Sequence, residues 1–203
     1  MASLIEVLII FATGFGFNLI PFAGPSNLLI ASTAAISLGN ADIATLVLIG
    51  VAVAFGAALA KGVHYMVTFF VSGHLSKKRQ ERLNEDATKI RRWAMGLLFL
   101  VAATPLPDEP VVIPLGLMKY SPTKFFLSYF LGKLTIAIAG AFIGQEASNL
   151  FSNWLSPEAL IVISIVLTVV ITIILLKVDL GKLTEQILHR QQTQNTKNIN
   201  TKP

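Results

Sequence analysis

Two adjacent acids, Asp108 and Glu109, lie in an apolar stretch, residues 93–118, that contains no other charged residue. A carboxyl group in apolar surroundings favours its neutral form, so it can take up and release a proton. Ionisable groups are costly in hydrocarbon surroundings, and we therefore interpret both acids as functional. The alternative is a helix cap, because an acid beside Pro110 satisfies free N–H groups at the start of a helix.

Two lysines could balance these acids, because Lys61 and Lys133 are the only basic residues outside three basic clusters. Lys133 lies about two and a half turns inside its apolar helix, and we expect it to pair with Asp108 or Glu109. Lys61 lies inside the apolar stretch 43–71, and two interpretations stay open for it. It is either a second cation of the site or a side chain that extends its ammonium group to the membrane surface.

A second polar position lies at Ser26 and Asn27, where the motif IPFAGPSN interrupts the first apolar stretch. A helix that starts here would direct its backbone N–H groups and its positive dipole end into the protein. Such a helix end can hold an anion, for example a phosphate group. Ionised Asp108 and Glu109 would repel this anion, so its binding requires protonated acids or a nearby cation.

Closely spaced prolines interrupt two of the apolar stretches. Each proline removes a backbone N–H donor and breaks the helix. Interrupted helices within a membrane survive where they are buried in protein or line a watery cavity. We therefore expect each break to be the bend of a helical hairpin at the functional site. The helix-breaking residues are Pro21, Pro25, Pro105, Pro107 and Pro110.

The composition is that of an integral membrane protein. Of the 203 residues, 54% are hydrophobic and 13% are charged, and a soluble domain of this size carries more polar surface. The formal charge of +5 does not indicate nucleic-acid binding, because the basic residues gather between apolar runs. Of sixteen Lys and Arg residues, seven lie in 74–92, two are Lys119 and Lys124, and five lie from Lys177 onward. Such clusters mark the cytoplasmic side, and we expect a cell-membrane protein with these regions in the cytoplasm.

From this charge distribution we predict an all-α, polytopic membrane protein with two inverted repeats and a closing C-terminal transmembrane helix. Each repeat is a re-entrant helical hairpin followed by a transmembrane helix. An alternative for the first hairpin is that residues 4–20 span the membrane and residues 27–38 return. The predicted elements are hairpin 1 at about 4–38, a transmembrane helix at 43–71, the cytoplasmic basic loop at 74–92, hairpin 2 at about 93–118, and transmembrane helices at 124–145 and 159–177. They form a membrane domain, 1–178, and the remaining tail, 179–203, is predicted to be largely disordered.

The two breaks together resemble the hairpins of the DedA family, also called VTT or SNARE-associated membrane proteins. The resemblance covers about residues 10–176. It is carried by PFAGPSNLLIAS, and by the spacing of Pro105, Pro107, Gly116, Met118, Tyr120 and Phe125. Two positions depart from the family pattern. Asn27 stands where many bacterial members have an acid, and Asp108 stands where they have an arginine, so the sequence resembles a divergent branch with a PDEP second hairpin.

The resemblance implies lipid handling. We expect a transporter of the DedA type that flips or scrambles a lipid or a polyprenyl-phosphate lipid carrier, with protons coupled through the buried acids. The alternative is a small-solute or cation/proton exporter, because an acid-rich centre without arginine suits cations. We expect no enzyme and no cofactor or metal, because neither a His pair with acids at metal-ligand spacing nor a Ser/His/Asp group is visible.

The expected partners are membrane lipids, the lipid substrate and protons, without nucleic acid. A homodimer is a further expectation. Gly140 and Gly144 form a small-residue face that suits close helix packing, either within the fold or between two copies of the chain.

Overall fold

The computed structural model describes residues 2–21, 24–75, 93–151 and 153–177, and the regular structure within these ranges is entirely helical. The predictions of a cytoplasmic basic loop and a disordered tail concern mainly residues 76–92 and 178–203, which lie outside the described residues. Residues Met1–Thr168 form one compact unit. The candidate site lies within this unit.

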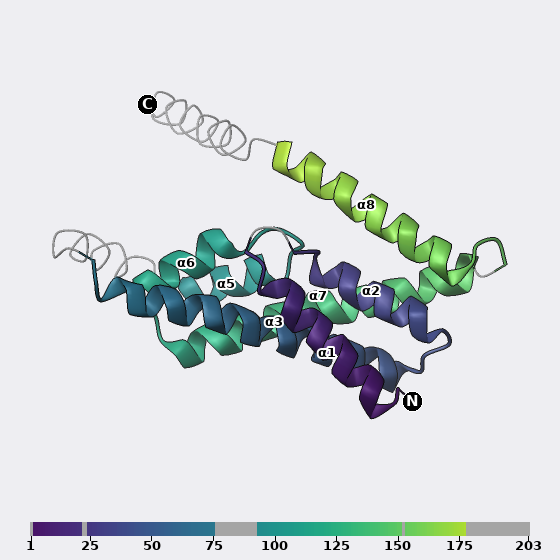
Figure 1. Cartoon of the computed structure of the whole chain (residues 1–203), viewed down its shortest axis with the longest axis horizontal. Coiled ribbons are helices and arrows are strands. Elements are labelled where there is room, and N and C mark those ends of the chain that lie inside the picture. Colours follow the sequence, from purple (N-terminus) through teal and green to yellow (C-terminus); the bar gives the residue numbers. More distant parts are fainter. Residues whose placement is uncertain (1, 22–23, 76–92, 152, 178–203) are drawn as a thin grey trace, which may run out of the picture. The chain divides into compact units, whose positions relative to one another are not determined.

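The first apolar stretch forms two helices, α1 (Leu4–Asn18) and α2 (Asn27–Leu38). Helix α1 begins with a capping box in which Ser3 and Glu6 satisfy each other's backbone N–H groups. Ser26 is the N-cap of α2, and its hydroxyl accepts a hydrogen bond from the Leu29 N–H. The chain reverses direction between the two helices (Figure 1). The two helices form a helical hairpin with its bend at the proline-rich motif, and that this hairpin is re-entrant stays a prediction.

Two helices of 30 residues follow the hairpins in sequence: α3 (Ile43–Ser72) and α7 (Pro122–Phe151). Each is about 45 Å long at 1.5 Å per residue, longer than the hydrocarbon core of roughly 30 Å. Among the described helices, these two have the length and hydropathy needed to cross a membrane. Helix α7 continues for six residues beyond the predicted membrane span 124–145, because the polar side chains after residue 145 end the apolar run without interrupting the backbone hydrogen bonds.

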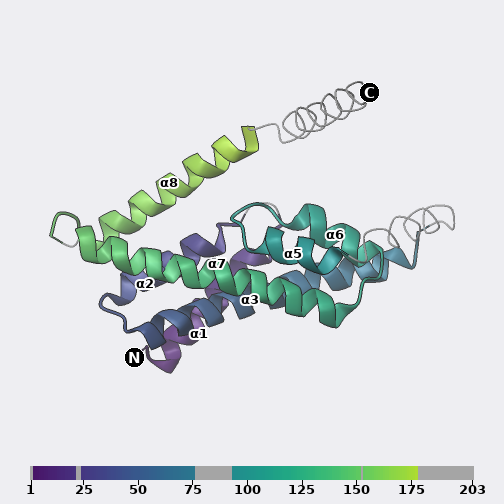
Figure 2. The same ribbon diagram turned by 180° about the vertical axis from the view of Figure 1, so that it is seen from behind.

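The third apolar stretch forms α5 (Ala94–Ala102) and α6 (Glu109–Leu117). The break between them contains Pro105 and Pro107, as predicted, and the chain again reverses direction there (Figure 2). Helix α8 (Pro157–Lys177) corresponds to the predicted closing helix. That α8 spans the membrane stays a prediction.

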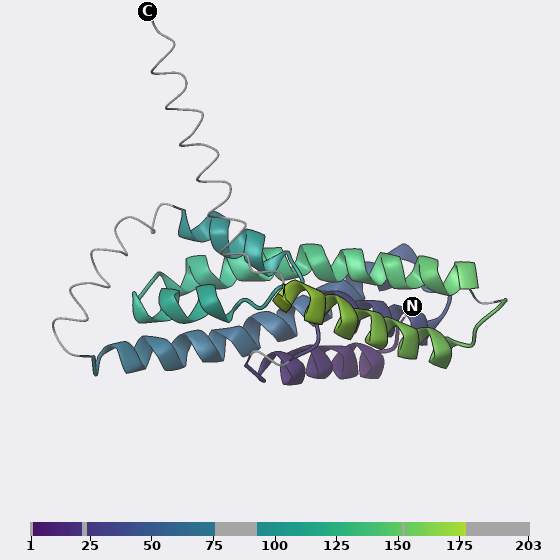
Figure 3. The ribbon, with the colours of Figure 1, turned by 90° about the horizontal axis from the view of Figure 1, so that it is seen from above.

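Both hairpins pack on the two long helices in the same way. Hairpin 1 places α1 against α3 and α2 against α7, and hairpin 2 places α6 against α3 and α5 against α7. Helices α3 and α7 also pack against each other, as the view from above shows (Figure 3). Two apolar cores result. The core at hairpin 1 contains Ile30, Leu46 and Ile49, and the core at hairpin 2 contains Leu98, Val112 and Phe125.

The small-residue face of α7 is used within the fold. A Cβ atom on Gly140 would lie 2.4 Å from the Leu28 carbonyl oxygen, and one on Gly144 would lie 2.3 Å from the Ser32 carbonyl oxygen. Helix α2 therefore approaches α7 so closely that only glycine fits at these positions. The sequence allowed this face to pack either within the fold or between two copies of the chain, and in the structure it packs within the fold.

We expect Gly144→Ala to lower the melting temperature, because the added methyl group forces α2 away from α7 at a cost of about 1–3 kcal/mol. The matched control is Gly96→Ala on α5, where a Cβ atom meets no atom within 4 Å. Alanine is the better helix former by about 1 kcal/mol, so this control should melt at the wild-type temperature or above it. Circular dichroism during heating in detergent measures both. Equal melting of the two variants would contradict the tight α2–α7 contact.

Candidate functional site

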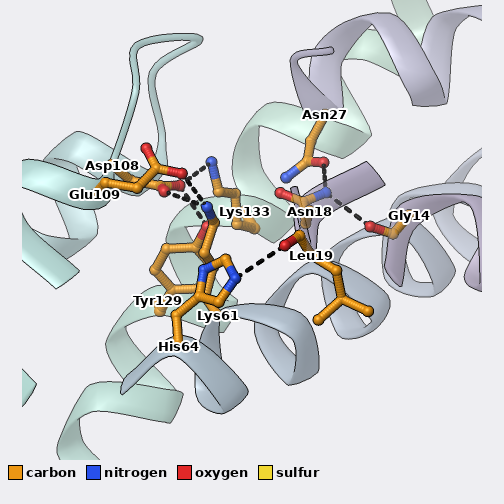
Figure 4. A network of polar contacts seen from close by, with 10 residues as sticks. All are labelled: Gly14, Asn18, Leu19, Asn27, Lys61, His64, Asp108, Glu109, Tyr129 and Lys133. Atoms are coloured by element: carbon orange, nitrogen blue, oxygen red, sulfur yellow. Dashed lines mark hydrogen bonds and ion pairs between the residues drawn. The ribbon is translucent and has the colours of Figure 1, made fainter. Parts of the chain in front are cut away.

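A buried cluster of four charged side chains lies where hairpin 2 meets the two long helices (Figure 4). Asp108 and Glu109, at the start of α6, are each only 4% exposed. The Asp108 carboxylate lies between two cations: its Oδ1 is 3.1 Å from Lys61 Nζ, and its Oδ2 is 2.9 Å from Lys133 Nζ. Lys61 also forms an ion pair with Glu109. The cluster therefore joins α3, α6 and α7.

The break in hairpin 2 directs the acids toward the lysines. Asp108 occupies the capping position of α6, yet its side chain makes no capping hydrogen bond. The hydrogen-bonding cap considered as the alternative role of Asp108 is therefore absent. Both carboxylate oxygens of Asp108 are directed to the lysines instead.

Lys61 does not extend to a membrane surface, so that interpretation is wrong. The residue is buried with 3% exposure, and its side chain ends in the ion pairs with the two acids. Lys133 is 5% exposed and pairs with Asp108, as expected from its depth in the helix. Lys61 on α3 and Lys133 on α7 thus both reach the acids at the break of hairpin 2.

Tyr129 is a fifth member of the cluster, and it is not among the site residues predicted from the sequence. Its hydroxyl donates a hydrogen bond to Asp108 Oδ2, and its ring lies 5.3 Å from the Lys133 ammonium. The spacing contains a signal that could have found it, because Tyr129 precedes Lys133 by four residues and therefore shares its helix face. Tyr129 therefore contacts both Asp108 and Lys133 and helps to fix their relative positions.

The four charges of the cluster balance, with two carboxylates and two ammonium groups. Buried charges of this kind are retained only when they are paired, because removing each from water is expensive. The nearby cations favour the ionised form of Asp108, which opposes the effect of burial alone. An additional charged group can therefore enter the cluster only by displacing one partner or by changing the protonation of an acid.

The break in hairpin 1 carries neutral polar groups. Asn18 at the end of α1 donates through Nδ2 to Asn27 Oδ1 and to the Gly14 carbonyl oxygen, both at 2.7 Å. Asn27 is 2% exposed. Its own amide nitrogen is the one buried side-chain N or O atom without a hydrogen-bond partner in the part of the chain that the structure describes. Ser26, predicted as a site residue beside it, caps α2.

The two breaks lie close to each other. His64 Nε2 lies 3.0 Å from the carbonyl oxygen of Leu19, the residue that follows α1. His64 is three residues after Lys61 on α3, so the end of α1 reaches α3 within one turn of the ion cluster. Figure 4 shows the Asn18–Asn27 pair on the side of the cluster where Lys133 lies. Of the predicted site residues, the structure thus brings together Lys61, Asp108, Glu109 and Lys133, whereas Asn27 pairs with Asn18 at the break of hairpin 1.

The predicted prolines lie at the two breaks and not in the cluster itself. Pro21 and Pro25 belong to the bend of hairpin 1, and Pro105 and Pro107 belong to the bend of hairpin 2. Pro110 lies in the first turn of α6. Among the described residues, no group of three or more His, Asp or Glu side chains could hold a metal ion.

A family model described as the VTT domain matches residues 5–146. The match includes hairpin 1, α3, hairpin 2 and most of α7, and therefore every residue of the ion cluster and of the asparagine pair. No curated protein and no solved structure matches the chain.

Proposed function

The chain belongs to the VTT-domain family, also called the DedA family, and from this membership we propose that it flips or scrambles a lipid or a polyprenyl-phosphate lipid carrier. The family is one of membrane proteins with a transporter-like function. In the proposed arrangement the protein lies in the cell membrane with the basic loop and the C-terminus in the cytoplasm. It acts as a transporter and not as an enzyme.

The observation that supports this proposal best is the balanced ion cluster beside the two broken hairpins. If the hairpins are re-entrant and enter from opposite faces as inverted repeats, their breaks meet near the middle of the bilayer. A lipid headgroup could cross there while its acyl chains stay in hydrocarbon. Lys61 and Lys133 supply cations for a phosphate group, as point charges in place of arginine.

Charge balance suggests how protons take part. A phosphate group with one negative charge that pairs with Lys133 leaves Asp108 with less compensation. Uptake of one proton by Asp108 restores the neutrality of the cluster. Release of that proton lets the Asp108–Lys133 pair form again and weakens phosphate binding. The proposed cycle thus moves one proton onto the site when the headgroup binds and off the site when it leaves.

A small-solute or cation/proton exporter is the second candidate. The acids at the centre favour it, because no arginine accompanies them. The two buried lysines favour the lipid proposal, because they supply the cations that a phosphate group requires.

We expect purified protein in proteoliposomes to move fluorescent phospholipids or polyprenyl phosphates between leaflets faster than lipids move in protein-free vesicles. A pH gradient should change the rate of movement if protons are coupled to it. Dithionite bleaching of the outer-leaflet label measures the rate. Lipid movement equal to that in protein-free vesicles would overturn the lipid proposal. Cation-dependent pH changes in the same vesicles would then support the exporter.

A further inference from the structure

Asp108 receives one of its hydrogen bonds from an uncharged group, the hydroxyl of Tyr129. The hydroxyl donates to Oδ2, the same oxygen that lies 2.9 Å from Lys133 Nζ. Lys61 lies at the other oxygen, Oδ1. Hydrogen bonds to the charged form of an acid favour that form. The Tyr129 hydroxyl therefore adds to the stabilisation that the two lysines give to ionised Asp108.

The position of this hydroxyl is fixed by a row of stacked rings. Tyr129 is fully buried, and its ring centroid lies 5.9 Å from that of Phe125. Phe125 is stacked in turn on Tyr65, with a centroid distance of 4.4 Å. The Tyr65 hydroxyl donates to the Tyr120 carbonyl oxygen and so fixes the other end of the row. Close packing of this kind leaves the Tyr129 ring little freedom to turn.

The titratable and charged groups that face Asp108 come from three helices. They are Lys61 from α3, Lys133 and Tyr129 from α7, and Glu109 next to Asp108 on α6. Helix α5, which also packs on α6, has no titratable residue. His64 on α3 is directed to the Leu19 carbonyl oxygen. Tyr129 is therefore the member of this set that binds Asp108 without adding a charge.

A phenol hydroxyl can serve both protonation states of an acid, because it can donate and also accept a hydrogen bond. The Tyr129 hydroxyl donates to ionised Asp108. Once Asp108 takes up a proton on Oδ2, the phenol oxygen can accept a hydrogen bond from the protonated acid. In the proposed cycle Lys133 leaves Asp108 for the phosphate group. Tyr129 then provides the hydrogen bond that stays at Oδ2.

We propose that Tyr129 is a positioning residue that sets the pH at which the ion cluster takes up its proton. Its hydroxyl favours the ionised form of Asp108 and so delays protonation until Lys133 has left. Its ring lies 5.3 Å from the Lys133 ammonium and keeps the lysine near the acid. This inference rests on the proposed function and adds how that function depends on pH.

Tyr129→Phe tests this role, because it removes the hydroxyl and keeps the ring with its stacking and its contact to Lys133. Tyr65→Phe is the matched control. It removes a buried hydroxyl from the same row of rings, and this hydroxyl is directed to the Tyr120 carbonyl oxygen and not to the cluster. Both variants keep the packed rings, so both should fold.

Infrared spectroscopy during a pH titration in detergent follows the band of the protonated carboxyl group. Loss of the band in Asp108→Asn identifies it as that of Asp108. We expect the midpoint of its titration to move up by about one pH unit in Tyr129→Phe, because the ionised carboxylate loses a donor. Tyr65→Phe should titrate at the wild-type midpoint.

Three results would overturn the proposal. One is an equal midpoint in Tyr129→Phe and Tyr65→Phe, and another is a lower midpoint in Tyr129→Phe than in the wild type. The third is a band that survives Asp108→Asn, because it would assign the proton to Glu109.

The same comparison in a Lys133→Met background represents the step in which Lys133 has left Asp108. The cluster then has one net negative charge, so it takes up a proton at a higher pH than the wild-type cluster does. Tyr129→Phe should again raise the midpoint by about one pH unit. If the wild-type band appears only in acid that unfolds the protein, this background decides the outcome, and an unchanged midpoint overturns the proposal.

Lipid movement in proteoliposomes at a series of pH values separates this inference from the proposed function. The pH dependence of lipid movement should shift in Tyr129→Phe together with the infrared band. If the band shifts but the wild type moves no lipid, the positioning role stands and the proposed function fails. If the wild type moves lipid, and both variants titrate and move lipid as it does at every pH, the proposed function stands and the positioning role fails.

Discussion

Asp108→Asn is expected to abolish lipid movement and to lower the free energy of unfolding by about 3–5 kcal/mol. The reason is that Asp108 is the common partner of Lys61, Lys133 and Tyr129. Asparagine keeps the shape of the side chain but removes the negative charge, so a buried excess of positive charge stays behind. Lipid movement is measured in proteoliposomes, and unfolding by chemical denaturation in detergent.

Asp42→Asn is the matched control for this change. Asp42 is exposed and caps α3 by accepting from the Thr45 N–H at 3.1 Å. The Thr45 hydrogen bonds lower the pKa of Asp42, so the carboxylate is charged at neutral pH. Asparagine is an equally good cap, and we expect wild-type stability and lipid movement. Wild-type lipid movement by Asp108→Asn would remove Asp108 from the transport mechanism.

The double variant Asp108→Asn/Lys133→Met should be more stable than the sum of its two single changes predicts, by about 1–3 kcal/mol. Removing one charge of each sign restores neutrality within the cluster, because Lys61 and Glu109 stay as a pair. The double variant should nevertheless move no lipid, because the group that accepts the proton is missing. Denaturation of the wild type, both single variants and the double variant measures the coupling.

The control for this coupling is Asp42→Asn/Lys133→Met, in which the two residues share no partner. Its effects should add to within about 0.5 kcal/mol. Additive effects in the Asp108 pair would mean that the ion pair contributes no coupling to stability. If the double variant Asp108→Asn/Lys133→Met regained lipid movement as well as stability, Asp108 would contribute to the stability of the fold and not to transport itself.

The two hairpins contribute different kinds of polar side chain. Hairpin 2 brings both acids to the centre, while hairpin 1 brings the neutral pair Asn18 and Asn27. The sequence resemblance implies arginines at the second hairpin in other members. Here the buried cations come from α3 and α7 instead. The proposed headgroup site therefore takes its cations from the long helices and not from hairpin 2.

The helical class and the positions of the breaks could be predicted from local sequence. Apolar runs of about 20 residues define helices in a bilayer, and prolines interrupt them wherever they stand. For this reason the helices end on either side of the two proline-containing breaks. The end of α7 could not be predicted in this way, because hydropathy reports the membrane boundary and not the end of the backbone hydrogen bonds.

The partners within the site were decided by the tertiary structure. Lys61 lies 47 residues before Asp108 in the sequence, and nothing local distinguishes a buried ion pair from a lysine that reaches the surface. Only the packing of α6 on α3 and of α5 on α7 brings both lysines to one carboxylate. Likewise, only the fold brings the Asn18 amide nitrogen to the Asn27 side-chain oxygen. The local sequence determines where helices form and where prolines interrupt them. Which charged side chains pair depends on which helices pack against each other.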